Sequence, residues 1–189
     1  MDLLFEILTL PKPSIFIREF EEEIFDLIPE LEKSKGFKQN NDWHIYDVYN
    51  HTLNVVDNVP SDLNLRLAAL FHDIGKPDTY TEDENGVGHF YGHWDKSKEI
   101  FLKFAKRNRL NLKQLILVSK LIEYHDISIN SLTEEDLNAL LELFTRDELM
   151  MLFQLKKADL LSQNTKYHNL LISYEEQQKH VLKMKELLW

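Results

Sequence analysis

Apolar residues recur every three or four positions along most of this chain, with polar residues between them. Residues 14–28 show the pattern, with phenylalanine and isoleucine on one face, glutamate on the other, and Ser14 placed to cap the helix. The pattern therefore predicts a mostly helical protein. The same spacing predicts further helices over about 46–58, 62–75, 93–107, 111–125, 133–143, 146–163 and 167–187.

Two segments lack this spacing and carry residues that favour turns. Residues 30–45 contain Gly36 and a pair of asparagines, and we expect them to be irregular. Residues 78–92 are polar and contain Asn85-Gly86, which is a strong signal for a tight turn. We expect a short hairpin or flap in this second segment.

Several predicted helix ends carry residues suited to capping. Ser61 or Asp62 suits the start of the third predicted helix. At its end, Gly75 can take a left-handed cap conformation and Pro77 should prevent continuation. Thr133 is followed three residues later by an acid, as in a capping box.

The composition supports a helical, globular protein. Hydrophobic residues make up 43% of the 189 residues, and there are only 5 glycines and 5 prolines. There are no cysteines, which excludes disulfides and thiolate zinc sites. With no internal repeat, low-complexity tract or linker, we expect one all-α domain over residues 1–189.

The charge and the hydropathy exclude some partners. The formal net charge is −10, from 22 basic and 32 acidic residues, so there is no strong case for nucleic acid as a partner. No apolar run approaches the roughly 20 residues that span a bilayer, and the acidic N-terminus does not resemble a signal peptide. We expect a cytoplasmic protein without a membrane partner. The sequence leaves its oligomeric state open.

The most informative polar residues are the neighbours His72 and Asp73. They follow residues 67–71, Leu-Ala-Ala-Leu-Phe, which have the composition of a core helix. Buried imidazole and carboxylate groups need partners where they lie. A divalent metal ion would satisfy both, and nitrogen with oxygen suits Mn, Fe, Ni, Co or Zn better than Ca.

Other candidate ligands fall on apolar faces of separate helices. His51, His125 and Asp159 each follow buried-type residues at helical spacing, and His93 begins another predicted helix. Each alone is as well explained by a hydrogen-bonded core residue or an ion pair. Together with the doublet they favour a metal site. The remaining histidines carry weaker signals: His44 in a loop, His89 in the flap, and His168 and His180, to which we assign no role.

The order of these residues resembles a known superfamily. His51, then His72-Asp73, then Asp159 looks like the HD-domain superfamily of metal-dependent phosphohydrolases. Residues 44–126 and the stretch KKADLLSQN at 156–164 are similar to the HD domain of bacterial tRNA nucleotidyltransferases, the CCA-adding enzymes. The resemblance covers about two-thirds of the chain and places the motif-bearing core at about 44–164.

The resemblance implies roles for particular residues. One metal ion would be held by His51, His72, Asp73 and Asp159, and a second by His93 and His125 with Asp73 bridging. One or two divalent ions are implied, among Mn, Fe, Ni, Co, Zn and Mg. Resemblance to HD-x-x-K members suggests that Lys76 contacts phosphate, although a solvated lysine at a helix end explains it equally well.

The chain also departs from the CCA-adding pattern. Nothing before residue 44 resembles the nucleotidyltransferase head of those enzymes, so we expect an HD domain standing alone. Asp126 follows His125 where many two-metal members have a second histidine.

Three hypotheses follow. The first is a metal-dependent phosphohydrolase with catalytic residues His72, Asp73 and Lys76. It would act through metal-activated water on a nucleotide or small phosphoester, either a phosphomonoester or a 2′,3′-cyclic phosphodiester. The second is a metal-retaining nucleotide-binding regulatory module with little or no turnover, docking through the C-terminal residues 187–189. The third is a helical bundle with incidental histidines, which would bind no stoichiometric metal.

Overall fold

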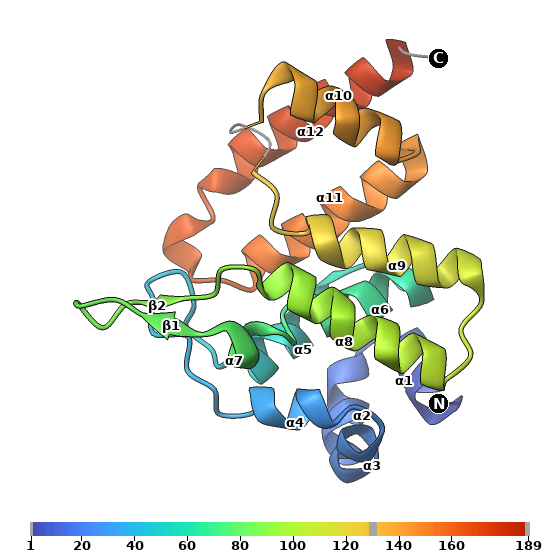
Figure 1. Cartoon of the computed structure of the whole chain (residues 1–189), viewed down its shortest axis with the longest axis vertical. Helices are drawn as coiled ribbons and strands as arrows, with labels where there is room; N and C mark the ends of the chain where they lie inside the picture. Colours follow the sequence, from blue (N-terminus) through green and yellow to red (C-terminus); the bar gives the residue numbers. More distant parts are fainter. Residues whose placement is uncertain (1, 129–131, 188–189) are drawn as a thin grey trace.

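The structure is a computed structural model that describes residues 2–128 and 132–187. It confirms the all-α fold class, with one two-stranded sheet beside the helices (Figure 1). Leu188 and Trp189, at the predicted docking end, lie outside the described residues. The elements are α1 (Asp2–Thr9), α2 (Pro13–Glu19), α3 (Glu21–Leu27), α4 (Pro29–Ser34), α5 (Val48–Asn58), α6 (Leu63–Phe71), α7 (Lys76–Thr79), β1 (Thr81–Glu82), β2 (Gly88–His89), α8 (His93–Arg107), α9 (Leu112–Tyr124), α10 (Glu134–Leu143), α11 (Arg146–Leu161), the 3₁₀ turn η2 (Thr165–Tyr167) and α12 (Leu170–Leu187).

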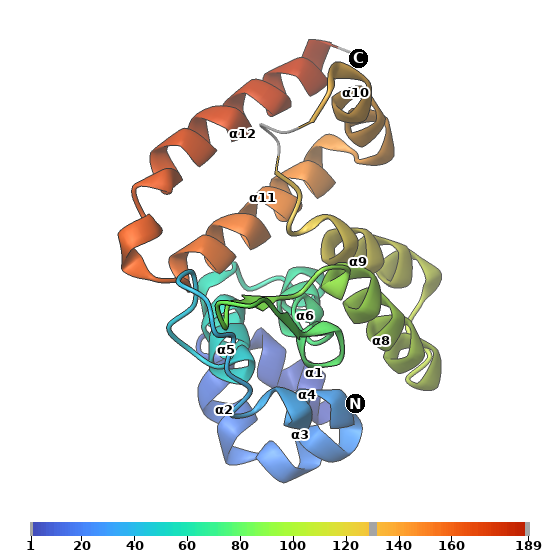
Figure 2. The ribbon, with the colours of Figure 1, turned by 60° about the vertical axis from the view of Figure 1, so that its left-hand side comes forward.

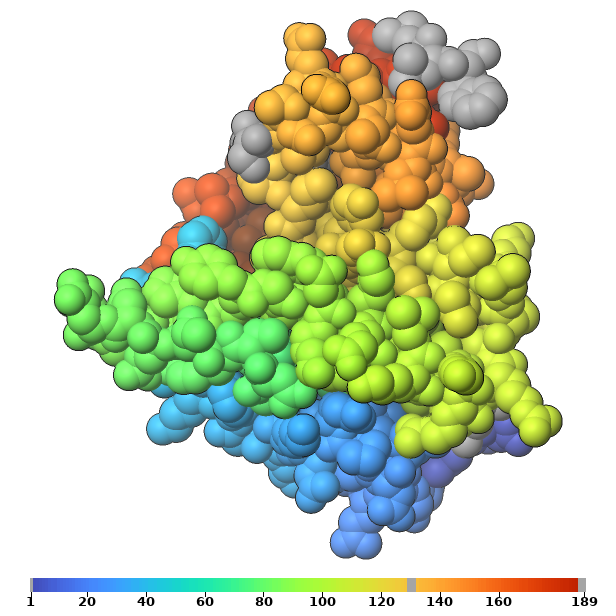
Figure 3. Space-filling view, in the orientation of Figure 1, coloured from blue at the N-terminus to red at the C-terminus, as the bar shows by residue number. Residues whose placement is uncertain are grey.

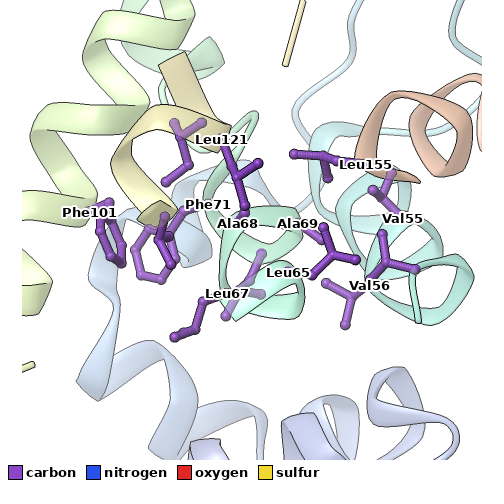
Figure 4. Close-up of a cluster of buried hydrophobic side chains, with 14 of the residues drawn as sticks. Val55, Val56, Leu65, Leu67, Ala68, Ala69, Phe71, Phe101, Leu121 and Leu155 are labelled. Atoms are coloured by element: carbon purple, nitrogen blue, oxygen red, sulfur yellow. The ribbon is translucent and has the colours of Figure 1, made fainter. Parts of the chain in front are cut away.

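Helix α6 is the central element of the fold. It contacts α1, α5, α8, α9 and α11, and every residue from Leu65 to Phe71 is buried. Such a helix is largely apolar because its sides meet other helices, and its one buried charged residue, Arg66, donates to the Leu8 carbonyl at 2.6 Å. The Asp62 side chain caps it by accepting from the Leu65 N–H at 2.9 Å. Figure 4 shows apolar side chains of α5, α8, α9 and α11 packed around it.

The other helices lie above and below this centre. In Figures 1 and 2, α10, α11 and α12 form the upper part of the molecule, and α1 to α4 form the lower part. Helix α12 packs along α11, and α2 and α4 pack against α5. None of the described helices is long and apolar enough to cross a membrane.

The N-terminal region corrects the predicted helix over 14–28. It divides at Phe20, whose backbone (φ −107°, ψ 36°) leaves the helical region, so that α2 and α3 are separate. Ser14 does not cap the helix. Its hydroxyl donates to Asp57 at 2.7 Å, and Pro13 occupies the first turn. Helix α4 also occupies part of the segment expected to be irregular.

The end of the third predicted helix is a second correction. Helix α6 ends at Phe71, and Gly75 has φ −81°, so it is not a left-handed cap. Pro77 lies in the first turn of α7 and begins a helix instead of preventing one. Gly75 is required by packing, because a Cβ there would lie 2.7 Å from the His93 carbonyl oxygen. The chain therefore turns sharply between α6 and α7, directly against α8.

Two predicted features are confirmed. β1 and β2 pair as an antiparallel hairpin, with Thr81 opposite His89 and Gly86 in the left-handed region at φ 76°. Thr133 and Asp136 form the predicted capping box at the start of α10. The hairpin projects from one side of the molecule beside α7 (Figure 1).

Candidate metal centre

All six predicted ligands come together where several helix ends meet. His72 caps the C-terminal end of α6, and His125 caps that of α9. His93 is the first residue of α8, and Asp73 lies in the turn after α6. His51 reaches the site from α5 and Asp159 from α11. The negative ends of α6 and α9 and the positive end of α8 therefore lie at the site, so two of the three helix dipoles favour a cation there.

The side chains form two groups of ligand atoms. His51, His72 and Asp159 make the first, with His51 Nε2 2.9 Å from Asp159 Oδ1. Asp73, His93 and His125 make the second, with the two histidine Nε2 atoms 3.2 Å apart. Within each group the ligand atoms lie within 4.8 Å of one another.

The Asp73 carboxylate lies between the two groups. Its Oδ1 is 3.2 Å from His93 Nε2 and 3.5 Å from His125 Nε2. Its Oδ2 is 3.2 Å from His72 Nε2 and 3.4 Å from His51 Nε2. One carboxylate oxygen thus faces each group, which is the geometry that a bridging ligand requires.

Backbone carbonyls set the orientation of all four imidazoles. The Nδ1 atoms of His72, His93 and His125 each donate to the carbonyl three residues earlier, at 2.7, 2.8 and 2.7 Å. His51 Nδ1 faces the Ser162 carbonyl at 3.4 Å. A carbonyl only accepts, so the hydrogen belongs on Nδ1 and each Nε2 presents a lone pair. This is how histidine ligands are held in metal proteins.

The donor set fits a divalent metal ion. His51 Nε2, His72 Nε2 and Asp73 Oδ1 are buried, and none has a hydrogen-bond partner within the described part of the chain. His51 Nε2 lies 2.9 Å from Asp159 Oδ1, a contact that is favourable only when a proton or a metal ion lies between the two atoms. Buried polar atoms without partners are costly. Nitrogen and oxygen donors in this number suit Mn, Fe, Co, Ni or Zn.

The electrostatics of the site also favour a cation. Burial would raise the pKa of Asp73, but the neighbouring His72 and Lys76 outweigh it and hold this pKa well below its usual value. Burial would lower the pKa of His72, but the Asp73 carboxylate outweighs it and raises this pKa, so a bound metal ion would take the place of the His72 proton. Burial would likewise raise the pKa of Asp159, yet its interaction with His51 keeps that pKa low. Burial lowers the pKa of His125 and favours its neutral form. Ionised carboxylates and neutral imidazoles are the forms that bind metals.

Lys76 lies inside the site and is not a solvated lysine at a helix end. Its side chain is 6% exposed, and Nζ is 2.7 Å from Asp73 Oδ2. Nζ also donates to Gln39 Oε1 at 2.9 Å. Gln39 comes from an irregular loop without periodicity, so no sequence signal pointed to it.

His44 is closer to the site than its loop position suggested. Its ring lies 4.9 Å from the His51 ring, and its Nε2 is 3.5 Å from Lys76 Nζ. Burial, with the charges of Lys76 and His51, lowers the pKa of His44 to about 2. The other weak candidates differ: His89 lines the cavity described below, whereas His180 is exposed on α12.

The site opens into a cavity of about 630 Å³. Figure 3 shows a recess between the green atoms of the hairpin and α8 and the orange-red atoms of the C-terminal helices. Lys156 lines this cavity, and its Nζ donates to the His125 carbonyl at 2.8 Å. Lys156 stands three residues before Asp159 on α11, so helical spacing could have identified it.

The fold and the site define a helical domain with buried histidine and aspartate ligand groups. The family model of the HD domain matches residues 44–181, and the chain belongs to the HD-domain family. HD domains form a superfamily of metal-dependent phosphohydrolases. The match extends past residue 164, where we expected the motif-bearing core to end.

Two curated relatives are similar to part of the chain. The A-adding tRNA nucleotidyltransferase of Deinococcus radiodurans is 30% identical over 108 residues, 54% of this chain and 25% of the relative. The multifunctional CCA protein of Nitrosococcus oceani is 30% identical over 105 residues, 53% of this chain and 25% of the relative. The matched part thus spans about a quarter of the length of each relative.

Proposed function

We propose that this chain is a metal-dependent phosphohydrolase that acts on a nucleotide or a small phosphoester. The observation that carries the proposal is the Asp73 carboxylate, which faces one ligand group with each oxygen. His51, His72 and Asp159 would hold one divalent ion and His93 and His125 a second, with Asp73 shared. The name of one relative, an A-adding tRNA nucleotidyltransferase, supports a nucleotide.

The bound ions would lower the pKa of a water molecule and offset charge on phosphoryl oxygens. The chain's own residues contribute positive charge. Lys76 is held in place by Asp73 and Gln39, so it can bind a phosphoryl oxygen with little loss of side-chain freedom. Lys156 adds a second amine to the cavity. The pKa of Asp73 is held well below its usual value, so this carboxylate is a weak base and would serve as the shared ligand, not as the acceptor of the water proton.

Phosphomonoesters and 2′,3′-cyclic phosphodiesters would use the same residues. Both need positive charge at the phosphoryl oxygens and an acceptor for the proton of water. We therefore include both classes in the proposal and separate them by assay.

The test combines metal analysis with an activity screen of Asp73→Asn, which keeps the shape of the side chain and removes its charge. The substrates are nucleoside monophosphates, 2′,3′-cyclic AMP and bis-p-nitrophenyl phosphate. Even partners of metal ligands cost about 10- to 100-fold when mutated, so we expect Asp73→Asn to lose at least about 100-fold in kcat/KM, together with bound metal. Asp95→Asn, an exposed carboxylate in the first turn of α8, should behave like the wild type.

Activity that survives in Asp73→Asn would contradict the catalytic assignment. A metal-loaded wild-type protein that hydrolyses none of these substrates would contradict the hydrolase and leave the regulatory module.

A further inference from the structure

An exposed aromatic stack stands at the edge of the metal-centre cavity. The Trp43 and Tyr167 rings lie parallel, with centroids 3.7 Å apart and an interplanar angle of 18°. Lys166 Nζ lies 5.0 Å from the centroid of the Tyr167 ring. Trp43 lines the cavity and is 43% exposed, although Tyr167 covers one of its faces. Its second face is therefore open to the cavity or to solvent.

Contacts on both sides of the stack fix the position of Trp43. The Asn164 N–H donates to the Trp43 carbonyl at 2.8 Å, and the Asn164 side chain donates to the Asp42 carbonyl at 3.1 Å. Lys166 and Asp42 form an ion pair at 2.8 Å. The loop before α5 is thus tied to the segment after α11. An indole held in this way can stack on a planar group without losing further freedom.

This platform is adjacent to the metal centre. The next residue, His44, contacts the ring of the ligand His51, and neighbouring Cα atoms are about 3.8 Å apart. The segment that holds Trp43 follows α11, which carries Asp159. A molecule bound at the metal centre therefore lies within a short reach of the indole.

The lining of the cavity differs from one side to another. The metal-centre side carries Lys76 and Lys156, which suit phosphate. Helix α12 contributes Ser173 and Gln177, which are hydrogen-bonded to each other at 3.1 Å. Hydroxyl and carboxamide groups both donate and accept, as the polar edges of nucleobases do. A ligand with a phosphate at one end and a flat polar ring at the other matches this arrangement.

We infer that the substrate is a nucleotide whose base stacks on the open face of Trp43 while its phosphate lies at the metal centre. The inference rests on the proposed function for the position of the phosphate. It adds a specificity-determining residue, because Trp43 would separate nucleotides from phosphoesters that lack a base. Stacking of a base on an aromatic ring tolerates different bases, so selectivity for one base is not expected from Trp43.

The test measures binding of two probes that differ only in the base. Adenosine 5′-monophosphate and ribose 5-phosphate are titrated into metal-loaded protein by calorimetry, and chromatography shows whether each probe stays intact. Trp43→Ala should weaken binding of the adenosine monophosphate roughly 5- to 100-fold, the usual effect of one lost stacking contact. Binding of ribose 5-phosphate should change by less than about twofold. Trp43→Phe, which retains a ring, should recover much of the loss.

Tyr46→Ala is the matched control. Tyr46 is in the same loop and is equally exposed at 43%, but it lies outside the cavity lining formed by the described residues. We expect that Tyr46→Ala leaves the binding affinity for both probes unchanged. Equal weakening of both probes by Trp43→Ala, or no weakening of either, would overturn the inference. Trp43-dependent binding of adenosine monophosphate by a protein that hydrolyses none of the screened phosphoesters would support the stacking site and contradict the hydrolase.

Discussion

At the scale of single residues, the candidate centre depends on local hydrogen bonds that orient the ligands. Each imidazole at positions 72, 93 and 125 is held by the carbonyl three residues earlier, so the chain needs no distant partner to fix it. Asp73 then joins the two groups. Lys76 forms an ion pair with this carboxylate, with Nζ 2.7 Å from Asp73 Oδ2.

We predict that Lys76→Met lowers kcat/KM by roughly 10²-fold while the protein retains its metal, because one positively charged donor to the phosphoryl group is lost. Metal analysis and steady-state kinetics on the same preparation check this result. Lys113→Met, an exposed lysine in the first turn of α9, serves as the control. Loss of metal in Lys76→Met would show that the lysine holds the site together and would contradict a role in phosphate binding.

The positions of the candidate ligands could be predicted from the sequence because these residues lie on or at the ends of helices. Helical spacing placed His51, His125 and Asp159 on buried faces, and the apolar residues before His72 indicated burial. Gln39, His44 and Trp43 come from a loop, where spacing carries no information about which side chains point inward. Their positions depend on the contacts that the loop makes with the segment after α11.

At the scale of elements, the turn between α6 and α7 has to fit closely against α8. The Gly75 N–H donates to the Ser97 hydroxyl at 2.9 Å, and both residues are buried. The same contact lies beside His93, the first residue of α8. The sequence indicated a helix end at Gly75, but it could not show that the reason is a neighbouring helix and not a left-handed backbone.

We predict that Gly75→Ala lowers the free energy of unfolding by about 1–3 kcal/mol and also weakens metal binding, because α8 has to move away from the new methyl group. Urea unfolding and metal titration measure the two effects. Gly36→Ala is the comparison: its φ of 75° adds backbone strain, but the methyl group would meet no described atom within 4 Å. Gly36→Ala should lower the free energy of unfolding by about 1–2 kcal/mol without changing metal binding. Unchanged stability in Gly75→Ala would contradict this packing argument.

A second contact between elements ties α9 to α11. Glu148 accepts from Lys120 Nζ at 2.8 Å and from the Thr145 N–H at 2.8 Å. Burial would raise the pKa of Glu148, but these hydrogen bonds outweigh it and hold this pKa below the usual value of a glutamate. The ionised Glu148 carboxylate therefore stabilises the fold above pH 4.5. This stabilisation is lost as the pH falls through the lowered pKa that Glu148 has in the folded protein.

We predict that Glu148→Gln lowers the free energy of unfolding by about 0.5–2 kcal/mol at pH 7, with a smaller difference from the wild type below pH 4. Urea denaturation of both proteins at each pH gives the difference directly. Glu142→Gln, at an exposed position of α10, should leave stability unchanged at both pH values. If the difference in the free energy of unfolding does not depend on pH, the charge of Glu148 is not the cause of the stabilisation.

At the scale of the whole molecule, the candidate centre joins elements from distant parts of the sequence. Its ligands come from α5, the end of α6, α8, the end of α9 and α11, which surround the buried core of Figure 4. The helices predicted from the sequence correspond well to these elements. The prediction contained little about how the elements are arranged in space. The turn at Gly75 depends on packing between helices, which periodicity along one chain does not contain. Periodicity also did not predict the division of the first helix at Phe20.

The central claim is that the two ligand groups bind divalent ions. Untagged protein is incubated with Mn²⁺ and freed of unbound metal by gel filtration. Elemental analysis of this protein tests the claim directly. From the two groups we predict two ions per chain for the wild type and a clear loss of metal in Asp73→Asn. A wild-type protein that retains no stoichiometric Mn²⁺, Fe²⁺, Co²⁺, Ni²⁺ or Zn²⁺ would contradict the account.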